Sequence, residues 1–124
     1  GCIAASALLA LLFGEAGQEV VAEALSHGIM SAVNLAEVAS RLFFLGADEQ
    51  TTQNTLSDLP IEIVTFTAAH AYRAGLLPIA TKSRGLSLGD RACLATAEDL
   101  KLPVLTSDKS WSLPKLTVPV QVIR

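Results

Sequence analysis

The stretch 86–108, LSLGDRACLATAEDLKLPVLTSD, constrains the fold most, because a helix pattern is followed at once by a strand pattern. Ser87 with Asp90 three residues later has the form of a capping box, which predicts a helix start. Apolar residues then recur at helical spacing until a Lys and a Pro end the helix. The run 103–106 is short and apolar, as in buried parallel strands, and Asp108 follows it closely.

Asp90 and Asp108 each have an ordinary structural explanation. Asp90 fits a helix cap, and Asp108 fits a turn or an N-cap. The pair is harder to explain in this way, because a helix start and a strand end fall at the same edge of a parallel sheet. We therefore interpret the two acids as candidate functional residues.

Strand-like and helix-like segments alternate along the chain, which predicts an α/β fold, a three-layer α/β/α sandwich with a central parallel sheet. A chain of 124 residues is expected to form one domain, 1–124. The predicted strands cover 1–4, 29–30, 61–66, 103–106 and 118–123. The predicted helices cover 7–13, 18–25, 34–45, 49–56, 68–77 and 88–100.

Local signals predict how two of these helices begin. Ser6 is expected to cap the first helix, and Asn34 with Glu37 repeats the capping-box form at the start of the third. Phe43 and Phe44 lie beside the apolar stripe of the same helix, so we expect them to pack in the core.

The composition is apolar for a domain that folds in water: 51% of residues are hydrophobic, 17% are charged and the mean hydropathy is +0.47. Either the interior is very aliphatic or a partner covers an apolar surface. The apolar run 2–13 is too short to span a bilayer and lacks the basic flank of a signal peptide. Cys2 and Cys93 lack metal-ligand spacing, so we expect reduced core thiols and a cytoplasmic location.

Positive charge is concentrated in the last third of the chain. Residues 1–81 hold two basic residues against eight acids, whereas residues 82–124 hold seven against four. A basic segment around the candidate acids is compatible with a phosphate-bearing ligand, although a solvated charged face has the same composition. The candidate residues for binding such phosphates are Lys82, Arg84, Arg91 and Lys109.

Glu37 joins Asp90 and Asp108 as a third acid, because it follows a strand-like segment and ligands bind beyond the carboxyl ends of parallel strands. Three carboxylates at one edge repel one another unless cations hold them together. Oxygen ligands without a nearby His or Cys set indicate Mg²⁺ or Mn²⁺, and metal-assisted phosphodiester hydrolysis is the chemistry expected there. His70 lies within a helix, where a structural or surface role is expected.

Four segments resemble, in family order, the PIN domain and specifically the VapC-type toxins of bacterial toxin–antitoxin pairs. They are ASALLALLFGE at 5–15, SAVNLAEV at 31–38, GLSLGDRACLATA at 85–97 and LPVLTSDKSW at 102–111. The resemblance covers essentially the whole chain, and LSLGDRACLA is its most specific part. It implies an α/β/α sandwich, a Mg²⁺- or Mn²⁺-dependent endoribonuclease that cuts tRNA or ribosomal RNA, a homodimer, and inhibition by a VapB-type antitoxin.

The resemblance also implies roles for individual residues. Three acids match the second, third and fourth acids of the family, which are the implied catalytic metal ligands: Glu37, Asp90 and Asp108. Three polar residues match positions that support the site: Ser6, Asn34 and Thr106.

The first acid of the family is missing, because Ala4 stands where an Asp-Ala-Ser or Asp-Thr-Ser motif begins. Loss of this carboxylate removes a ligand and a negative charge, so the activity of the Ala4 form is expected to be strongly reduced. We interpret the chain as an engineered inactive form of a toxic nuclease. Its start at Gly1 instead of Met is typical of a processed or engineered chain. A naturally inactive relative is the alternative.

Three other function classes were compared with the nuclease. A catalytically inactive PIN-like module that binds RNA or protein fits the same residues. A phospho-receiver domain needs an acidic pair after its first strand, which Ala4 and Ala5 do not supply. A nucleotide-binding fold needs G-x-G-x-x-G or G-x-x-x-x-G-K-[ST], and the sequence has neither. The binding module is therefore the alternative that stays open.

Overall fold

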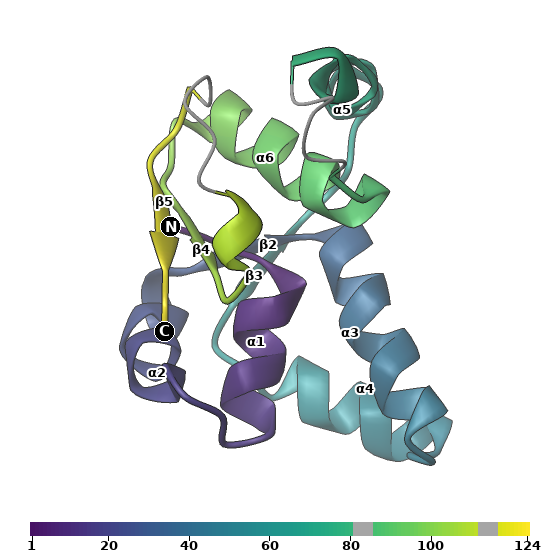
Figure 1. The fold of residues 1–124 in the computed structure, drawn as a ribbon. Coiled ribbons are helices and arrows are strands. Elements are labelled where there is room, and N and C mark those ends of the chain that lie inside the picture. Colours follow the sequence, from purple (N-terminus) through teal and green to yellow (C-terminus); the bar gives the residue numbers. More distant parts are fainter. Residues whose placement is uncertain (81–85, 112–116) are drawn as a thin grey trace.

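The centre of the computed structural model is a five-stranded sheet in which all paired strands are parallel (Figure 1). The structure describes residues 1–80, 86–111 and 117–124, with 78–80 described as backbone only. The strand order is β3-β2-β1-β4-β5. The strands are β1 (Cys2–Ile3), β2 (Ile29–Ser31), β3 (Glu62–Val64), β4 (Val104–Thr106) and β5 (Val120–Val122).

Helices connect these strands and cover the sheet. They are α1 (Ala5–Leu12), α2 (Gln18–Ala24), α3 (Ala32–Phe44), α4 (Glu49–Ser57), α5 (Ala68–Ala80) and α6 (Leu88–Leu100). Two single turns of 3₁₀ helix, η1 (Leu25–His27) and η2 (Lys109–Trp111), complete the described elements. Each predicted strand and helix has a counterpart, and the observed strands are two or three residues long.

Two hydrophobic cores lie on opposite faces of the sheet, because successive strand residues point to opposite sides. Cys2 and Val104 belong to the core that includes buried residues of α5 and α6. Ile3 and Leu105, one position later in each strand, belong to the core with α1, α2 and α3. Helices therefore cover both faces (Figure 1), and the predicted α/β/α sandwich is confirmed.

The order of the strands reverses beside β1. The chain proceeds from β1 to β2 and β3 on one side and returns on the other side as β4 and β5. In open parallel sheets, the crevice beyond the carboxyl ends at such a reversal is the usual ligand site. Ala4 directly follows β1 and donates its backbone N–H to the carbonyl oxygen of Leu105 at 2.9 Å. Residue 4 therefore lies at this crevice, beside β4.

The start of α6 is as predicted. Ser87 Oγ accepts from the Asp90 N–H, and Asp90 Oδ2 accepts from the Ser87 N–H, both at 3.1 Å. The start of α4 at Glu49 is also as predicted, and Asp48 Oδ1 caps this helix by accepting from the Thr51 N–H at 2.7 Å. Reciprocal side-chain caps of this kind are read from short sequence spacing alone.

Two predicted caps are wrong. α3 is capped by Ser31, whose Oγ accepts from the Val33 N–H at 3.2 Å, so Asn34 lies inside the first turn. Similarly, α1 begins before Ser6 and has no side-chain cap. Asn34 and Ser6 instead form hydrogen bonds with distant elements, and spacing along one helix does not reveal such partners.

The core packing predicted for two aromatic residues is also wrong. Phe43 is 46% exposed and Phe44 is 80% exposed. Both lie on the last turn of α3, whereas its buried residues, Asn34 and Val38, lie in the first half of the helix. The C-terminal end of α3 therefore presents apolar side chains at the surface.

His70 has the structural role that the sequence predicts. Its ring is buried, and Nδ1 accepts from the Thr67 N–H at 3.2 Å. Its Nε2 lies 2.9 Å from Asp99 Oδ2 on α6. Because Nδ1 accepts a backbone proton, the ring proton of a neutral His70 lies on Nε2 and points at Asp99. The pair therefore ties α5 to α6.

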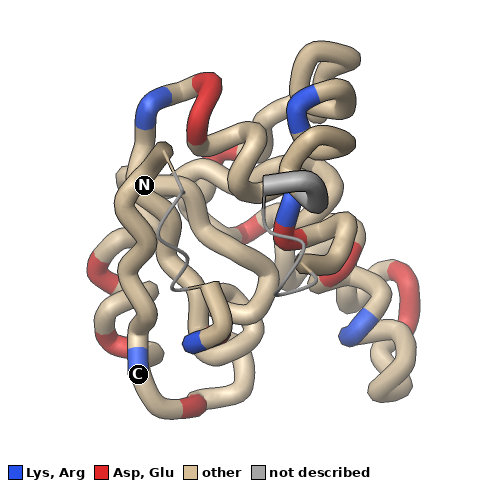
Figure 2. The backbone as a smooth tube through the Cα atoms, turned by 45° about the horizontal axis from the view of Figure 1, so that its top comes forward, with Lys and Arg blue, Asp and Glu red and all other residues tan. Residues whose placement is uncertain are grey.

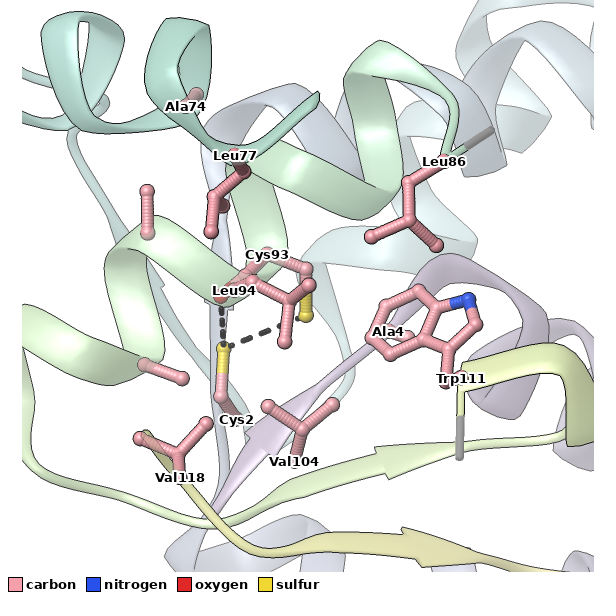
Figure 3. Packing of buried hydrophobic residues seen from close by; sticks show 12 residues of the cluster. Cys2, Ala4, Ala74, Leu77, Leu86, Cys93, Leu94, Val104, Trp111 and Val118 are labelled. Carbon is pink, nitrogen blue, oxygen red and sulfur yellow. Dashed lines mark hydrogen bonds between the residues drawn. The ribbon is translucent and has the colours of Figure 1, made fainter. Parts of the chain in front are cut away.

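The two cysteines are free and buried, as predicted. The Sγ atoms of Cys2 and Cys93 lie 3.8 Å apart in the core between β1 and α6 (Figure 3). Their hydrogen bond, together with burial, raises the pKa of the Cys93 thiol well above its usual value. Cys93 therefore remains a protonated, apolar part of this core at neutral pH.

Candidate functional site

A cavity of about 290 Å³ contains most of the residues that the sequence assigns to a site. Its walls come from the end of β1 and from α1, α3 and α6. Five predicted site residues line it: Ala4, Ser6, Asn34, Glu37 and Asp90. Leu9, Arg41 and Trp111 are also part of its lining. Residue 4 and two of the predicted acids thus meet at the crevice where the strand order reverses.

Asn34 joins two of the elements that form the cavity. Its side chain is buried, and Nδ2 donates to Glu37 Oε1 at 2.7 Å and to the carbonyl oxygen of Gly89 at 3.0 Å. Both partners are acceptors, so the orientation of the amide is fixed. Asn34 Oδ1 is then left buried without a hydrogen-bond partner among the described residues. A buried acceptor of this kind favours a ligand or an ordered water beside it.

Gly89 allows Glu37 to reach this position. A Cβ atom at residue 89 would overlap the carboxylate of Glu37. Gly89 has no positive φ and lies inside α6, so its backbone conformation alone does not require glycine. Its small size therefore makes room for the Glu37 carboxylate in this position.

Gly89→Ala is expected to separate stability from function. Alanine raises helix propensity by about 1 kcal/mol, and Glu37 is exposed enough to swing away. We expect an unchanged or slightly higher midpoint in urea, together with about 10- to 100-fold weaker Mn²⁺ binding in calorimetry. Equal metal affinity in Gly89→Ala and the parent chain would contradict a functional reason for this glycine.

Asp90 caps α6 and also lines the cavity. Its Oδ2 closes the capping box with the Ser87 N–H, while the residue lines the cavity beside Glu37. The capping explanation of Asp90 is therefore correct, but it does not exclude a second role. One oxygen is fixed by the helix, which orients the other.

Glu37 has a pKa above its ordinary value. The main cause is partial desolvation of the carboxylate, and the negative charge of Asp90 adds to it. The hydrogen bond from Asn34 acts in the opposite direction but does not cancel these effects. The charge of Asp90 therefore disfavours ionisation of Glu37, and a bound cation would remove this repulsion.

The raised pKa predicts a pH dependence for metal binding. A proton competes with the cation for Glu37, so Mn²⁺ affinity is expected to fall as pH decreases through a pKa that lies above the ordinary 4.5. Carboxyl NMR titration of the metal-free chain measures this pKa directly, and the signal should be absent from Glu37→Gln. A midpoint at or below 4.5 would contradict the prediction.

Asp108 and Thr106 lie beside the cavity rather than in its lining. The Oγ atoms of Ser6 and Thr106 lie 3.1 Å apart, which joins α1 to the end of β4. Thr106 Oγ1 also accepts from the Asp108 N–H at 3.1 Å. The carboxylate of Asp108 accepts from the Ser110 N–H at 2.9 Å and is exposed. Asp108 is therefore placed at the end of a strand adjacent to β1, and its role as a ligand stays a prediction.

The donor set fits a hydrated Mg²⁺ or Mn²⁺ ion. Two carboxylates and the unpartnered Asn34 Oδ1 offer oxygen only, and Mg²⁺ commonly binds through one or two carboxylates while keeping several waters. Among the described residues, no group of three or more His, Cys, Asp or Glu side chains is arranged to hold a metal. Ala4 occupies the place where another carboxylate would extend the set.

The predicted basic residues differ in what they contact. Lys82 and Arg84 lie outside the described residues. Arg91 donates to the carbonyl oxygens of Ser87 and Ala74, at 3.3 and 3.4 Å, so it holds the start of α6 to α5. Lys109 is exposed. Figure 2 shows basic residues spread over the described chain rather than gathered in one segment, so the charge asymmetry does not produce a single basic patch there.

Sequence reasoning did not single out Arg41, Gly89 or Trp111. Arg41 follows Glu37 by four residues, which places both on one face of a helix and is a signal that was available in the sequence. The role of Gly89 depends on the approach of a different helix. Trp111 belongs to η2, which follows β4, and no spacing in the sequence indicates that it lines the cavity.

The fold and this edge of the sheet define a class: an α/β/α domain with acids at the carboxyl ends of its parallel strands. The chain belongs to the PIN domain family, which matches residues 2–115. Comparison with curated protein sequences finds no match.

Solved structures share the fold over nearly the whole chain. A toxin–antitoxin complex from Klebsiella pneumoniae has a TM-score of 0.77 and 23% identity, covering 100% of this chain and 98% of that one. For DNA-bound VapBC from Salmonella typhimurium the TM-score is 0.74 and the identity 13%, covering 97% and 95%. For FitAcB from Neisseria gonorrhoeae they are 0.71 and 20%, covering 96% and 94%.

Proposed function

We propose that this chain is the toxin of a toxin–antitoxin pair, an endoribonuclease that depends on Mg²⁺ or Mn²⁺ and that Ala4 renders inactive. The observation that carries the proposal is that Ala4, Glu37 and Asp90 line one cavity of a PIN domain. Structures of the same fold include a toxin–antitoxin complex and DNA-bound VapBC, and these support the toxin role. The proposed substrate is a structured RNA, either tRNA or ribosomal RNA.

In the active form, Glu37, Asp90 and an Asp in place of Ala4 would hold the metal, with Asp108 as a further proposed ligand. Such an ion supplies an activated water and neutralises charge on the phosphodiester. The chain itself keeps the ligands in position. Asn34 holds Glu37, and the capping box holds Asp90.

A VapB-type antitoxin and a second copy of the chain are the proposed protein partners. The support is the apolar surface at the end of α3, where Phe43, Phe44 and Leu45 are 46%, 80% and 54% exposed. An adjoining cavity of about 470 Å³ between α3 and α4 includes Phe43 and Leu56 in its lining. Burial of such a surface on association is favourable.

We further propose that 1–124 acts as a single domain in the cytoplasm. None of the described helices has the length and apolarity to cross a membrane.

Controlled expression of Ala4→Asp in a bacterial host tests this function. We expect growth arrest together with new RNA ends that carry a 5′-phosphate, whereas the parent chain should cause neither. Ala4→Asn is the matched control, because it has nearly the size of Asp but no charge to hold a cation.

Two results would contradict the nuclease. Equal toxicity of Ala4→Asn and Ala4→Asp would show that the carboxylate is not needed. RNA binding without cleavage by the purified Ala4→Asp form, across tRNA and ribosomal RNA with Mg²⁺ or Mn²⁺, would favour the inactive binding module instead.

A further inference from the structure

Arg41 lies at the boundary between two hollows, one of which is the cavity lined by Glu37 and Asp90, called here the acid cavity. It lines the acid cavity and also a neighbouring groove of about 680 Å³, whose wall includes Ser87, Leu88 and Gly89 at the start of α6. Glu37 is shared by both hollows as well. Arg41 therefore lies where the acid cavity meets this groove.

The guanidinium of Arg41 is not used by the fold. Its Cζ lies 5.7 Å from the ring centroid of Phe44, a cation–π contact that orients the group without occupying its N–H donors. Among the described residues, the Arg41 guanidinium has no hydrogen-bond or ion-pair partner, and only the backbone carbonyl of Arg41 accepts a hydrogen bond, from the Leu45 N–H. Three other arginines are engaged: Arg73 with Glu98, Arg91 with two backbone carbonyls, and Arg124 with Glu15.

The absence of an ion pair between Glu37 and Arg41 is unexpected from the sequence. Glu followed by Arg four residues later on a helix is the favourable orientation for such a pair. Here Asn34 and the space over Gly89 draw the Glu37 carboxylate toward α6. The arrangement that holds the acid in the cavity therefore leaves the neighbouring cation free.

A phosphodiester is a suitable partner for the unused N–H donors of the Arg41 guanidinium. Glu37 and Asp90 repel an anionic backbone, so an approaching phosphate needs a cation beside these acids. The planar guanidinium can offer two parallel N–H donors to one phosphate. We infer that Arg41 binds the RNA phosphate that lies between the acid cavity and the adjoining groove. This inference rests on the proposed function and names a substrate contact within it.

RNA binding by the parent chain tests the contact without cleavage or a loaded metal site. A short labelled single-stranded RNA of mixed sequence is titrated over a series of NaCl concentrations. Arg41→Gln is expected to reduce the slope of log affinity against log salt by about 0.7, the value for one lost contact to a single strand. Lys101→Gln removes the same charge at the opposite end of α6 and should leave the slope unchanged.

Cleavage by the Ala4→Asp form gives a second readout. Adding Arg41→Gln should lower kcat/KM by about 10- to 100-fold, mainly through KM, and Arg41→Lys should recover only part of this loss. The midpoint of urea unfolding should hardly change, because Arg41 is exposed.

The outcomes separate this inference from the proposed function. If Arg41→Gln and Lys101→Gln behave alike while Ala4→Asp cleaves RNA, the inference is overturned and the nuclease stands. If the Arg41-dependent salt slope is present but Ala4→Asp is inert, the contact stands in a binding module. No measurable RNA binding by the parent chain even at low salt would overturn the inference.

Discussion

Replacing Ala4 with Asp is expected to raise the rate of metal-dependent RNA cleavage by the purified chain at least about 100-fold, since even partners of metal ligands contribute 10- to 100-fold. The backbone of residue 4 is already held beside β4 by its hydrogen bond to Leu105. Residue 4 also shares a cavity with Glu37 and Asp90. A new carboxylate would therefore join two acids that are already held in place, and Mn²⁺ affinity should rise together with the rate.

The measurement is a single-turnover cleavage assay with Mg²⁺ or Mn²⁺, paired with calorimetric titration of the metal. EDTA should abolish cleavage. Adding Asp90→Asn to Ala4→Asp should return the rate close to that of the parent chain, because the cavity again has two carboxylates. A rate that rises without any change in metal affinity would contradict the proposed role of residue 4.

Trp111→Ala is expected to lower the free energy of unfolding by about 3–5 kcal/mol. Trp111 is 1% exposed and is among the largest fully buried side chains. It packs close to Ala4 and Leu86 in the core beneath α6 (Figure 3). Its Nε1 has no hydrogen-bond partner among the described residues, so packing accounts for most of the expected loss.

Urea denaturation followed by circular dichroism measures this effect. Phe44→Ala serves as the control, because Phe44 is 80% exposed and its removal should change stability by no more than about 0.5 kcal/mol. A loss below about 1 kcal/mol for Trp111→Ala would mean that η2 is only loosely attached to the rest of the fold.

Sequence patterns predicted the fold well where the interactions are local. The spacing of Ser87 and Asp90 specifies both hydrogen bonds of the capping box, so the start of α6 was predictable. The alternation of strands and helices likewise predicted the parallel sheet. The same local reasoning misplaced the start of α3, because both Ser31 and Asn34 are residue types that cap helices and only the fold decides between them.

The grouping of the candidate acids was predicted in part, from the strand and helix pattern and from the resemblance to the PIN domain. Glu37 and Asp90 do line one cavity, while Asp108 lies at the end of the neighbouring strand. The contacts between helices could not be predicted from the sequence. The space that Gly89 leaves for Glu37 is set by the distance between α3 and α6, and no pattern within either helix encodes it.

The contacts of Asn34 have a consequence for how this sequence can diverge. One amide holds an acid of its own helix and the backbone of another helix, in a gap that only a glycine leaves open. A larger residue at position 89 or a shorter acid at position 37 would each disrupt the same arrangement. The effects of substitutions at Asn34, Glu37 and Gly89 on metal binding should therefore be non-additive.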